Sequence, residues 1–566
     1  MGNTSSLMPR EICDFKKIPH ERLEDINIPE RTENRHHTNL KWIIGLGLTV
    51  LILIPFLIYV LVNSDIKRIL YGFDECGNIC GQTNKEYDDI TCSGQDMTAK
   101  PYLLFIADKN NQNIDIFNPL APRKCVSECG NDTQKINKRC IPKDVLSSSF
   151  HISYVVDFFN TIKWQLIICC LLGILTSMLV LIILRYKTRC LIWSLLTTAL
   201  VGSIILVTAL WIVYAKADLE KERRRFFLII NISLTILALV LVFMFIFLRK
   251  KISLIILLIK EATKSIFDMP QLVALPITTV LVMVILNGAF LLVTFTMISY
   301  GHLVKVSEFY YFRMDAIGYF TLAFNAVVVL WLNVFLSGVE FMAVSGAVSH
   351  WYFARDKMFL HEPIKTSLTN TFKFHLGSAA LGSLIIVLMS ILRTVVLMLS
   401  NNKFRGLINC ILKPIEKLIR FFSSNSYIVT AIHGEAFVKS GKRAARLLLN
   451  NLEDVIAINY IGNFIFGMIQ LVIVAATVLF SVVIVAIFPV AEAFHDMFIY
   501  LAAGLVAAYV STVVLNLCHI AVDTLLICFC EDKLINDGSA KPFYASRNLL
   551  QFVEDSKRVF KKKEKK

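Results

Sequence analysis

Nine long apolar stretches constrain the fold of this 566-residue chain more than any other feature of its sequence. Each has the length of helix, roughly 20 residues, that crosses the roughly 30 Å hydrocarbon core of a bilayer. Because backbone polar groups find no water in lipid, such stretches are stable as helices, which satisfy their own hydrogen bonds. The stretches lie near residues 42–62, 164–184, 190–214, 226–248, 272–298, 318–345, 374–400, 461–488 and 497–528. The sequence therefore predicts an all-α polytopic membrane protein.

Composition and charge exclude several other classes of protein. Hydrophobic residues make up 56% of the chain and charged residues 18%, against about 45–50% and about 25% in soluble domains. These values exclude a disordered or collagen-like chain and an ordinary cytosolic enzyme. The net charge of +15 does not indicate a nucleic-acid partner, since the basic residues flank apolar stretches instead of forming one module. The expected environment is the lipid bilayer.

Charged residues in the loops predict the orientation of the chain. Arg185, Lys187 and Arg189 lie between the second and third stretches, 249–251 follows the fourth, and the tail 557–566 is strongly basic. Loops rich in Lys and Arg stay in the cytoplasm. We therefore expect cytoplasmic N- and C-termini. The expected location is the plasma membrane, with an organelle membrane as the alternative.

Two cytoplasmic termini require an even number of spans, so about ten transmembrane helices are expected where nine are evident. The tenth could be 252–268 or 408–428, and both segments are interrupted by charged residues. Either could instead be an amphipathic helix lying on the inner membrane surface. The sequence alone leaves this choice open.

The one long hydrophilic loop, 63–163, is rich in cysteine. An even number of cysteines in a small loop outside the membrane favours disulfide bonds, whose pairing the spacing does not fix. A zinc site is the competing interpretation, because two pairs are spaced like metal ligands. Asn131 begins an Asn-Asp-Thr acceptor for N-glycosylation, which agrees with an extracellular loop. The six cysteines are Cys76, Cys80, Cys92, Cys125, Cys129 and Cys140.

These features divide the chain into seven segments. The N-terminal segment, the linker between the two groups of spans and the basic tail are expected in the cytoplasm. The linker includes a basic amphipathic pattern over 437–458. In chain order the segments are 1–41 (N-terminal), 42–62 (first span), 63–163 (extracellular loop), 164–400 (core bundle), 401–460 (amphipathic linker), 461–530 (last spans) and 531–566 (tail).

No motif of enzyme chemistry is present in the sequence. It contains no Walker loop, no dinucleotide fingerprint, no His-Glu-x-x-His and no Gly-x-Ser-x-Gly elbow, each of which builds a recognisable site. We therefore expect no enzymatic activity, no cofactor and no resident metal. The candidates that remain are polar residues within the spans, since these are costly in lipid.

The span 318–345 carries the first candidate site. At about 100° per residue, Trp331 and Phe335 share one face of this helix, while Asn333 and Glu340 lie on the other. An aromatic wall near a carboxylate suits a quaternary ammonium ion, which is held by cation–π attraction. The alternative is that both faces pack against neighbouring helices, and the sequence does not separate the two interpretations.

The last span carries the second candidate. His519 and Asp523 are four residues apart, so they share a helix face and can form a hydrogen bond. Because histidine titrates near physiological pH, the pair could relay protons. It could equally be a static bond between helices.

Several blocks of residues resemble motifs of the choline transporter-like family of solute carriers. Gly346-Ala347 followed by Trp351-Tyr352-Phe353 resembles the family's Gly-Ala-x-x-x-Tyr/Trp-Tyr-Trp/Phe. The other blocks are 374–378 with Gly382, Ser383 and Arg393; 425–437; and 522–529 with Asp532, 536–538 and 542–544. Residues 73–74 and 77–81 resemble the start of the family's cysteine-bearing ectodomain.

The resemblance implies about ten spans, cytoplasmic termini and a glycosylated first loop. It also implies sodium-independent facilitated transport of choline, ethanolamine or a related small organic cation. Glu340 departs from the family pattern, in which Gln is expected at this position. Our hypothesis from the residues is capture by Trp331 and Phe335, with Glu340 adding charge and His519–Asp523 linking transport to protons. The alternative is a non-transporting scaffold or receptor whose disulfide-bonded loop binds a partner.

Overall fold

The computed structural model describes most of the chain between residues 28 and 550, and all structural statements below concern this part. The tail 557–566 and Asn131 lie outside it. The described residues are 28–86, 92–106, 122–130, 133–136, 138–142, 152–216, 221–247, 249–306, 309–357, 360–400, 402–449, 452–487, 493–536, 541–546 and 550.

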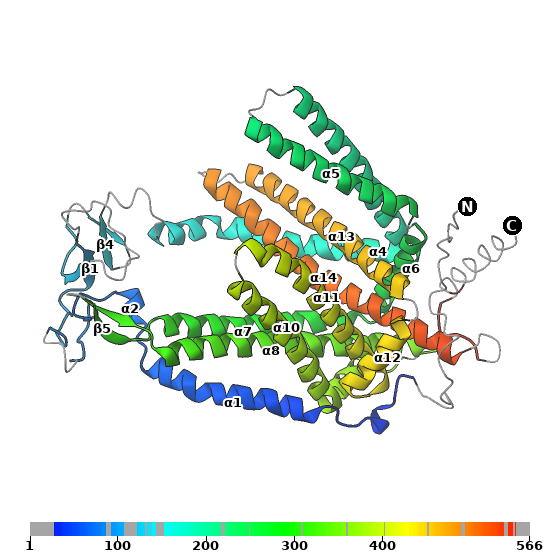
Figure 1. The fold of residues 1–566 in the computed structure, drawn as a ribbon, viewed down its shortest axis with the longest axis horizontal. Coiled ribbons are helices and arrows are strands. Elements are labelled where there is room, and N and C mark those ends of the chain that lie inside the picture. Colours follow the sequence, from blue (N-terminus) through cyan, green and yellow to red (C-terminus); the bar gives the residue numbers. More distant parts are fainter. Residues whose placement is uncertain are drawn as a thin grey trace.

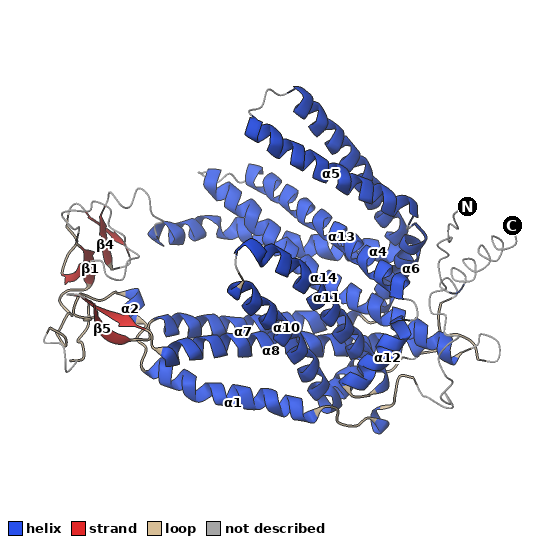
Figure 2. Ribbon diagram, viewed as in Figure 1, coloured by secondary structure: helices blue, strands red, loops and turns tan. Residues whose placement is uncertain are grey.

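Long helices form a bundle, and short strands gather at one end of it (Figures 1 and 2). The helices are α1 (Leu40–Val62), α2 (Lys67–Leu70), α4 (Ile152–Lys216), α5 (Lys221–Phe247), α6 (Arg249–Asp268), α7 (Ala274–Ile298), α8 (Ala316–Phe353), α9 (Pro363–Asn370), α10 (Leu376–Leu399), α11 (Asn402–His433), α12 (Phe437–Leu449), α13 (Leu452–Ile487) and α14 (Ala493–Ile535). A π-helical turn, Thr371–His375, joins α9 to α10. We call the end with the strands the strand end.

Eight helices of the described residues are long and apolar enough to cross a membrane. They account for all nine expected stretches, because α4 contains two of them. Its backbone leaves the helical conformation at Lys187, where φ is −128°. This bend falls between the expected stretches 164–184 and 190–214. The prediction of an all-α polytopic protein is confirmed.

The cysteine-rich loop folds as a small sheet held by three disulfides. Its strands are β1 (Tyr102–Phe105), β2 (Arg123–Val126), β3 (Thr133–Ile136) and β4 (Arg139–Pro142), in the spatial order β2-β1-β4-β3. The disulfide prediction is confirmed, and the zinc alternative is excluded for these residues because all six sulfurs are bonded. The pairs are Cys76–Cys92, Cys80–Cys125 and Cys129–Cys140.

A hairpin that the sequence analysis did not predict, β5 (His302–Val306) and β6 (Phe309–Arg313), ties this sheet to the bundle. The Tyr310 amide donates to the Glu75 carbonyl at 3.1 Å. The Arg68 guanidinium lies 3.9 Å from the centre of the Phe312 ring, within cation–π range. The hairpin thus joins the cysteine-rich segment to the strand end of α7 and α8.

Asp315 begins α8 at the strand end as its N-cap. Its Oδ1 accepts from the Gly318 amide at 2.8 Å, and its Oδ2 accepts from the Tyr300 hydroxyl at 3.0 Å. His302 Nε2 lies 3.3 Å from the same Oδ2. Burial opposes ionisation, but these hydrogen bonds and His302 hold the pKa of the Asp315 carboxyl below its usual value.

Helix α11 runs back along α10 for its whole length. The Tyr427 hydroxyl donates to Ala379 O near the start of α10, and Glu416 accepts from Ser390 farther along. Near the end of α10, the Arg405 side chain donates to Leu397 O. The cytoplasmic position expected for 401–460 stays a prediction. The next helix, α12, begins at Phe437, where the basic amphipathic pattern is expected to start, and it buries Ala444 and Leu447.

Helix α6, the other candidate for the tenth span, packs by one face against α4, α13 and α14. Ile252, Ile255, Ile259 and Ala262 are fully buried, while Lys260 is exposed. Their spacing of three or four residues gives a single apolar stripe, which is the pattern of an amphipathic helix.

Candidate functional site

His519 and Asp523 do meet on one face of α14, as the sequence predicts. His519 Nδ1 lies 3.3 Å from Asp523 Oδ2. On its other side, His519 Nε2 lies 3.0 Å from Asn463 Oδ1 of α13. The Asn463 amide is oriented in turn, because its Nδ2 donates to Asn459 Oδ1 at 2.8 Å.

The geometry fits an ion pair between the imidazole and the Asp523 carboxylate, with Nδ1 and Oδ2 3.3 Å apart. An imidazole that bonds Asn463 Oδ1 donates from Nε2, because an amide oxygen accepts. A role of the pair in carrying protons stays a prediction.

A small cavity of about 20 Å³ adjoins this pair. Such a volume holds about one water molecule. Phe421, Asn425 and Phe466 line it beside His519 and Asp523, with apolar side chains from α6, α12 and α14 completing the wall. The only titratable residues among the lining residues are His519 and Asp523, so Asp523 is the one group there that can offer negative charge to a ligand.

The candidates on α8 are not brought together in this conformation. Trp331 is 6% exposed, and its indole N–H donates to Ser383 Oγ at 3.0 Å and Ala380 O at 3.3 Å. Phe335 packs beside Trp331, in the cluster that includes Leu46 of α1 and Val387 of α10. These contacts pack α8 against its neighbours, and a role of Trp331 and Phe335 in binding a substrate stays a prediction.

The polar face of α8 points to α7. Asn333 and Asn287 exchange side-chain hydrogen bonds of 2.8 and 3.1 Å. The Glu340 carboxylate interacts with the Thr279 hydroxyl, also on α7. Glu340 therefore lies on a different side of the helix from Trp331, and the two do not line one cavity.

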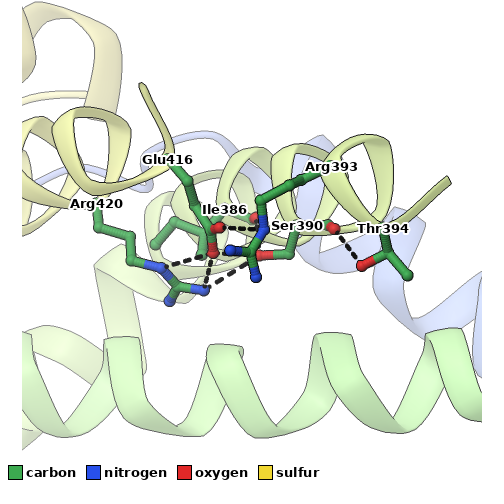
Figure 3. A network of polar contacts seen from close by, with 6 residues as sticks. All are labelled: Ile386, Ser390, Arg393, Thr394, Glu416 and Arg420. Atoms are coloured by element: carbon green, nitrogen blue, oxygen red, sulfur yellow. Dashed lines mark hydrogen bonds and ion pairs between the residues drawn. The ribbon is translucent and has the colours of Figure 1, made fainter. Parts of the chain in front are cut away.

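A second charged network joins α10 to α11 (Figure 3). Arg393 Nε lies 2.9 Å from Glu416 Oε2, and Arg420 Nη2 lies 2.8 Å from Oε1 of the same carboxylate. The Ser390 hydroxyl donates to Glu416 at 2.9 Å. Sequence reasoning noted Glu416 and Arg420 only as interruptions of a span and did not connect them with Arg393. Their pairing explains how α11 can lie along an apolar helix, because buried charges are tolerated when paired.

The end of the bundle opposite the strands is closed by residues 28–39, which we call the strap. Arg35 is 3% exposed. Its Nη2 donates to Ala431 O at 2.8 Å and Ile432 O at 3.2 Å, and its Nη1 lies 3.1 Å from His375 Nε2. Burial lowers the pKa of Arg35 to about 10, which still leaves it charged at neutral pH.

Further backbone contacts seat the strap on α10 and α11. The Glu30 and Thr38 amides donate to Ile432 O and Phe374 O, both at 2.9 Å. A Cβ at Gly377 would lie 2.4 Å from the carbonyl oxygens of Thr38 and Asn39. Only glycine permits this close approach.

Two buried acidic residues of α14 complete the closed end. Glu531 is bonded by Arg443 of α12 at 2.8 and 3.0 Å and lies 3.1 Å from His433 of α11. Asp532 accepts from the Tyr352 hydroxyl of α8 at 3.0 Å and from the Tyr544 amide at 2.8 Å. The four sequence blocks within the helices that resemble family motifs therefore meet at this end of the bundle. They lie at the ends of α8, α11 and α14 and at the start of α10.

Comparisons with known proteins agree with that resemblance. The family model described as "Plasma-membrane choline transporter" matches residues 232–534. Choline transporter-like protein 1 of Torpedo marmorata is 27% identical over 616 aligned positions that cover 94% of each chain. The protein of the same name from Mus musculus is 26% identical over 94% of each chain. Choline transporter-like protein 3 of Homo sapiens is 24% identical over 88% of each chain.

Proposed function

Because the chain belongs to the choline transporter-like family, we propose that it carries choline or a related small organic cation, such as ethanolamine, across the plasma membrane. The observation that carries this proposal is the His519–Asp523 pair beside a cavity within the bundle. An ionisable pair is costly in a membrane-spanning helix and marks ion or proton pathways. The relatives' names supply the class of substrate.

The driving force in this proposal is the membrane potential, without sodium. An inside-negative potential favours cation entry by about 2.3 kcal/mol per charge per 100 mV. In this proposal, a proton shared by His519 and Asp523 provides a second link between transport and its driving force. A cation that approaches the Asp523 carboxylate competes with that proton, so uptake is expected to respond to a pH gradient.

The topology that fits this function has α11 as its tenth span. α11 retraces α10 from near Leu397 to Ala379, so it covers the same depth of membrane. Counting both halves of α4 and α11 then gives ten spans, which place both termini on one side. We propose that this side, which carries the strap and the basic loop at Arg185 and Arg189, is the cytoplasm.

Transport by alternating access requires the closed end to open. In this proposal, the strap separates from the ends of α10 and α11 when the substrate is released to the cytoplasm. The hydrogen bonds of Arg35 stabilise the closed state, so losing them would shift the equilibrium towards the open state.

Uptake of radiolabelled choline into proteoliposomes tests the proposal. The purified protein is reconstituted and an inside-negative potential imposed, with and without a pH gradient and without sodium. We expect uptake that excess unlabelled choline abolishes and that increases with the potential. Absence of uptake above empty liposomes, from folded and correctly oriented protein, would reject the carrier and favour the scaffold or receptor alternative.

A further inference from the structure

The cavity beside His519 and Asp523 has the chemistry of a binding site for a quaternary ammonium ion. We propose that the substrate cation binds there, between α11, α13 and α14, with its charge on the Asp523 carboxylate and its methyl groups against Phe421 and Phe466. This inference rests on the proposed function and adds to it the place of binding. It differs from the aromatic face of α8 that the sequence suggested.

Charge and shape both support this position. Asp523 is the only lining carboxylate, and His519, 3.3 Å away, is the one lining residue that can carry a positive charge beside it, since no lysine or arginine lines the cavity. A quaternary ammonium donates no strong hydrogen bonds, so aromatic faces and one carboxylate are the groups that bind it best. Asn425 and Asn459 provide amide groups that could bind the hydroxyl of choline.

The corresponding groups on α8 are already engaged. Trp331 is bonded to Ser383, and Glu340 faces Thr279 on the other side of the helix. The side chains of His519 and Asp523 contact each other and keep 29% and 22% of their surface exposed. Both therefore retain surface that a ligand in the adjoining cavity can contact.

At about 20 Å³ the cavity is too small for choline, so binding in this proposal requires the side chains or helices around the cavity to move apart. The free space lies beside Gly462 of α13. Gly462 is buried and lines the cavity, yet a Cβ added there would meet no atom within 4 Å. A larger side chain at this position would occupy the space that the cation needs.

Gly462 also gives a sharp test, because filling the cavity leaves its charges unchanged. The variant Gly462→Leu places a side chain in the cavity, and leucine favours a helix over glycine. The matched control is Gly467→Leu on the same helix. Gly467 is exposed on the bundle surface, and a Cβ there also meets no atom within 4 Å. Asp523→Asn removes the proposed counter-charge, and Phe466→Leu removes one ring.

The experiment is equilibrium binding of radiolabelled choline to the full chain in lipid nanodiscs, with thermal unfolding of each variant as the folding control. The competitor is 3,3-dimethyl-1-butanol, the uncharged carbon analogue of choline. We expect at least a tenfold loss of affinity in Gly462→Leu, Asp523→Asn and Phe466→Leu, wild-type affinity in Gly467→Leu, and little competition by the neutral analogue.

The outcomes separate the site from the function. If wild-type protein binds choline and folded Gly462→Leu binds it equally well, the cation binds elsewhere and the site is rejected while the proposed function stands. If Asp523→Asn does not fold, Gly462→Leu and Phe466→Leu still decide. If folded wild-type protein binds no choline, both the site and the proposed function are rejected.

Discussion

Replacing Arg35 by glutamine should loosen the closed end of the bundle. The guanidinium makes two hydrogen bonds to the carbonyls of Ala431 and Ile432 and one to His375. Bonds from a charged donor contribute about 1.5–3 kcal/mol each, and buried partners left without a donor add a penalty. Glutamine can replace one of these three bonds, and a fourth bond, from Arg35 Nε to Glu30 O at 3.2 Å, lies within the strap. We therefore expect the closed state to lose about 3 kcal/mol, which is a factor of roughly 150 in its equilibrium with an open strap.

Hydrogen exchange measures this change directly, because the strap's own amides are bonded across the closed end. The Glu30 and Thr38 amides donate to Ile432 O and Phe374 O. Where exchange is limited by local opening, protection falls in proportion to the opening equilibrium. We expect these two amides to exchange about 100-fold faster in Arg35→Gln. The matched control is Arg31→Gln, which removes the same charge from an exposed side chain of the strap and should leave exchange unchanged.

Protection of Glu30 and Thr38 within threefold of wild type in folded Arg35→Gln would refute this reasoning. It would mean that the backbone bonds hold the strap and that the Arg35 side chain adds little. Equal acceleration in Arg31→Gln would also refute it, since a general charge effect would then explain the change.

Three further predictions concern the rest of the chain. The double variant Cys80→Ser/Cys125→Ser opens a loop of 45 residues and should lower the free energy of unfolding by about 4 kcal/mol in the chain-entropy model. We expect a lower unfolding temperature than in the control variant Cys410→Ser, which changes an exposed free thiol. Trp331→Leu should lose about 2–3 kcal/mol of stability through poorer packing but keep wild-type choline affinity; a tenfold loss of affinity in folded protein would instead restore the α8 site. Asp315→Ala removes an N-cap and should cost about 1 kcal/mol at pH 7. Because folding lowers the pKa of the Asp315 carboxyl, the stability difference between variant and wild type is fully present above about pH 4 and should shrink as the pH falls below it. Thermal unfolding of both proteins from pH 7 to pH 3 measures this difference. A difference that stays constant over this range would contradict the prediction.

The sequence predicted the helices well because span length and hydropathy are local properties. It left the tenth span open, because hydropathy counts Glu416 and Arg420 in α11 as unfavourable charges. Their cost is offset by Arg393 on a helix that pairs with α11 only in three dimensions. For the same reason, the spacing of six cysteines predicted disulfides but not the pairing, which depends on how the whole loop folds in three dimensions.

The candidate site shows the same limit. The helical period correctly placed Trp331 opposite Glu340 and put His519 beside Asp523. It did not say which helix packs against each face, so the indole that could have bound a cation is bonded to Ser383. Nothing in the sequence predicted the burial of Arg35. It lies in a polar segment that is buried only because α10 and α11 pack against it.

Counterflow in proteoliposomes tests the central claim, carriage of an organic cation by alternating access, most directly. Vesicles loaded with millimolar unlabelled choline are diluted into a trace of labelled choline, with the potential clamped to zero. A carrier that binds choline on each side in turn exchanges unlabelled choline from inside for labelled choline from outside. We therefore predict a transient accumulation of label above its equilibrium level, which is absent in Asp523→Asn. Label that rises to equilibrium without an overshoot, or does not enter at all, would contradict the account.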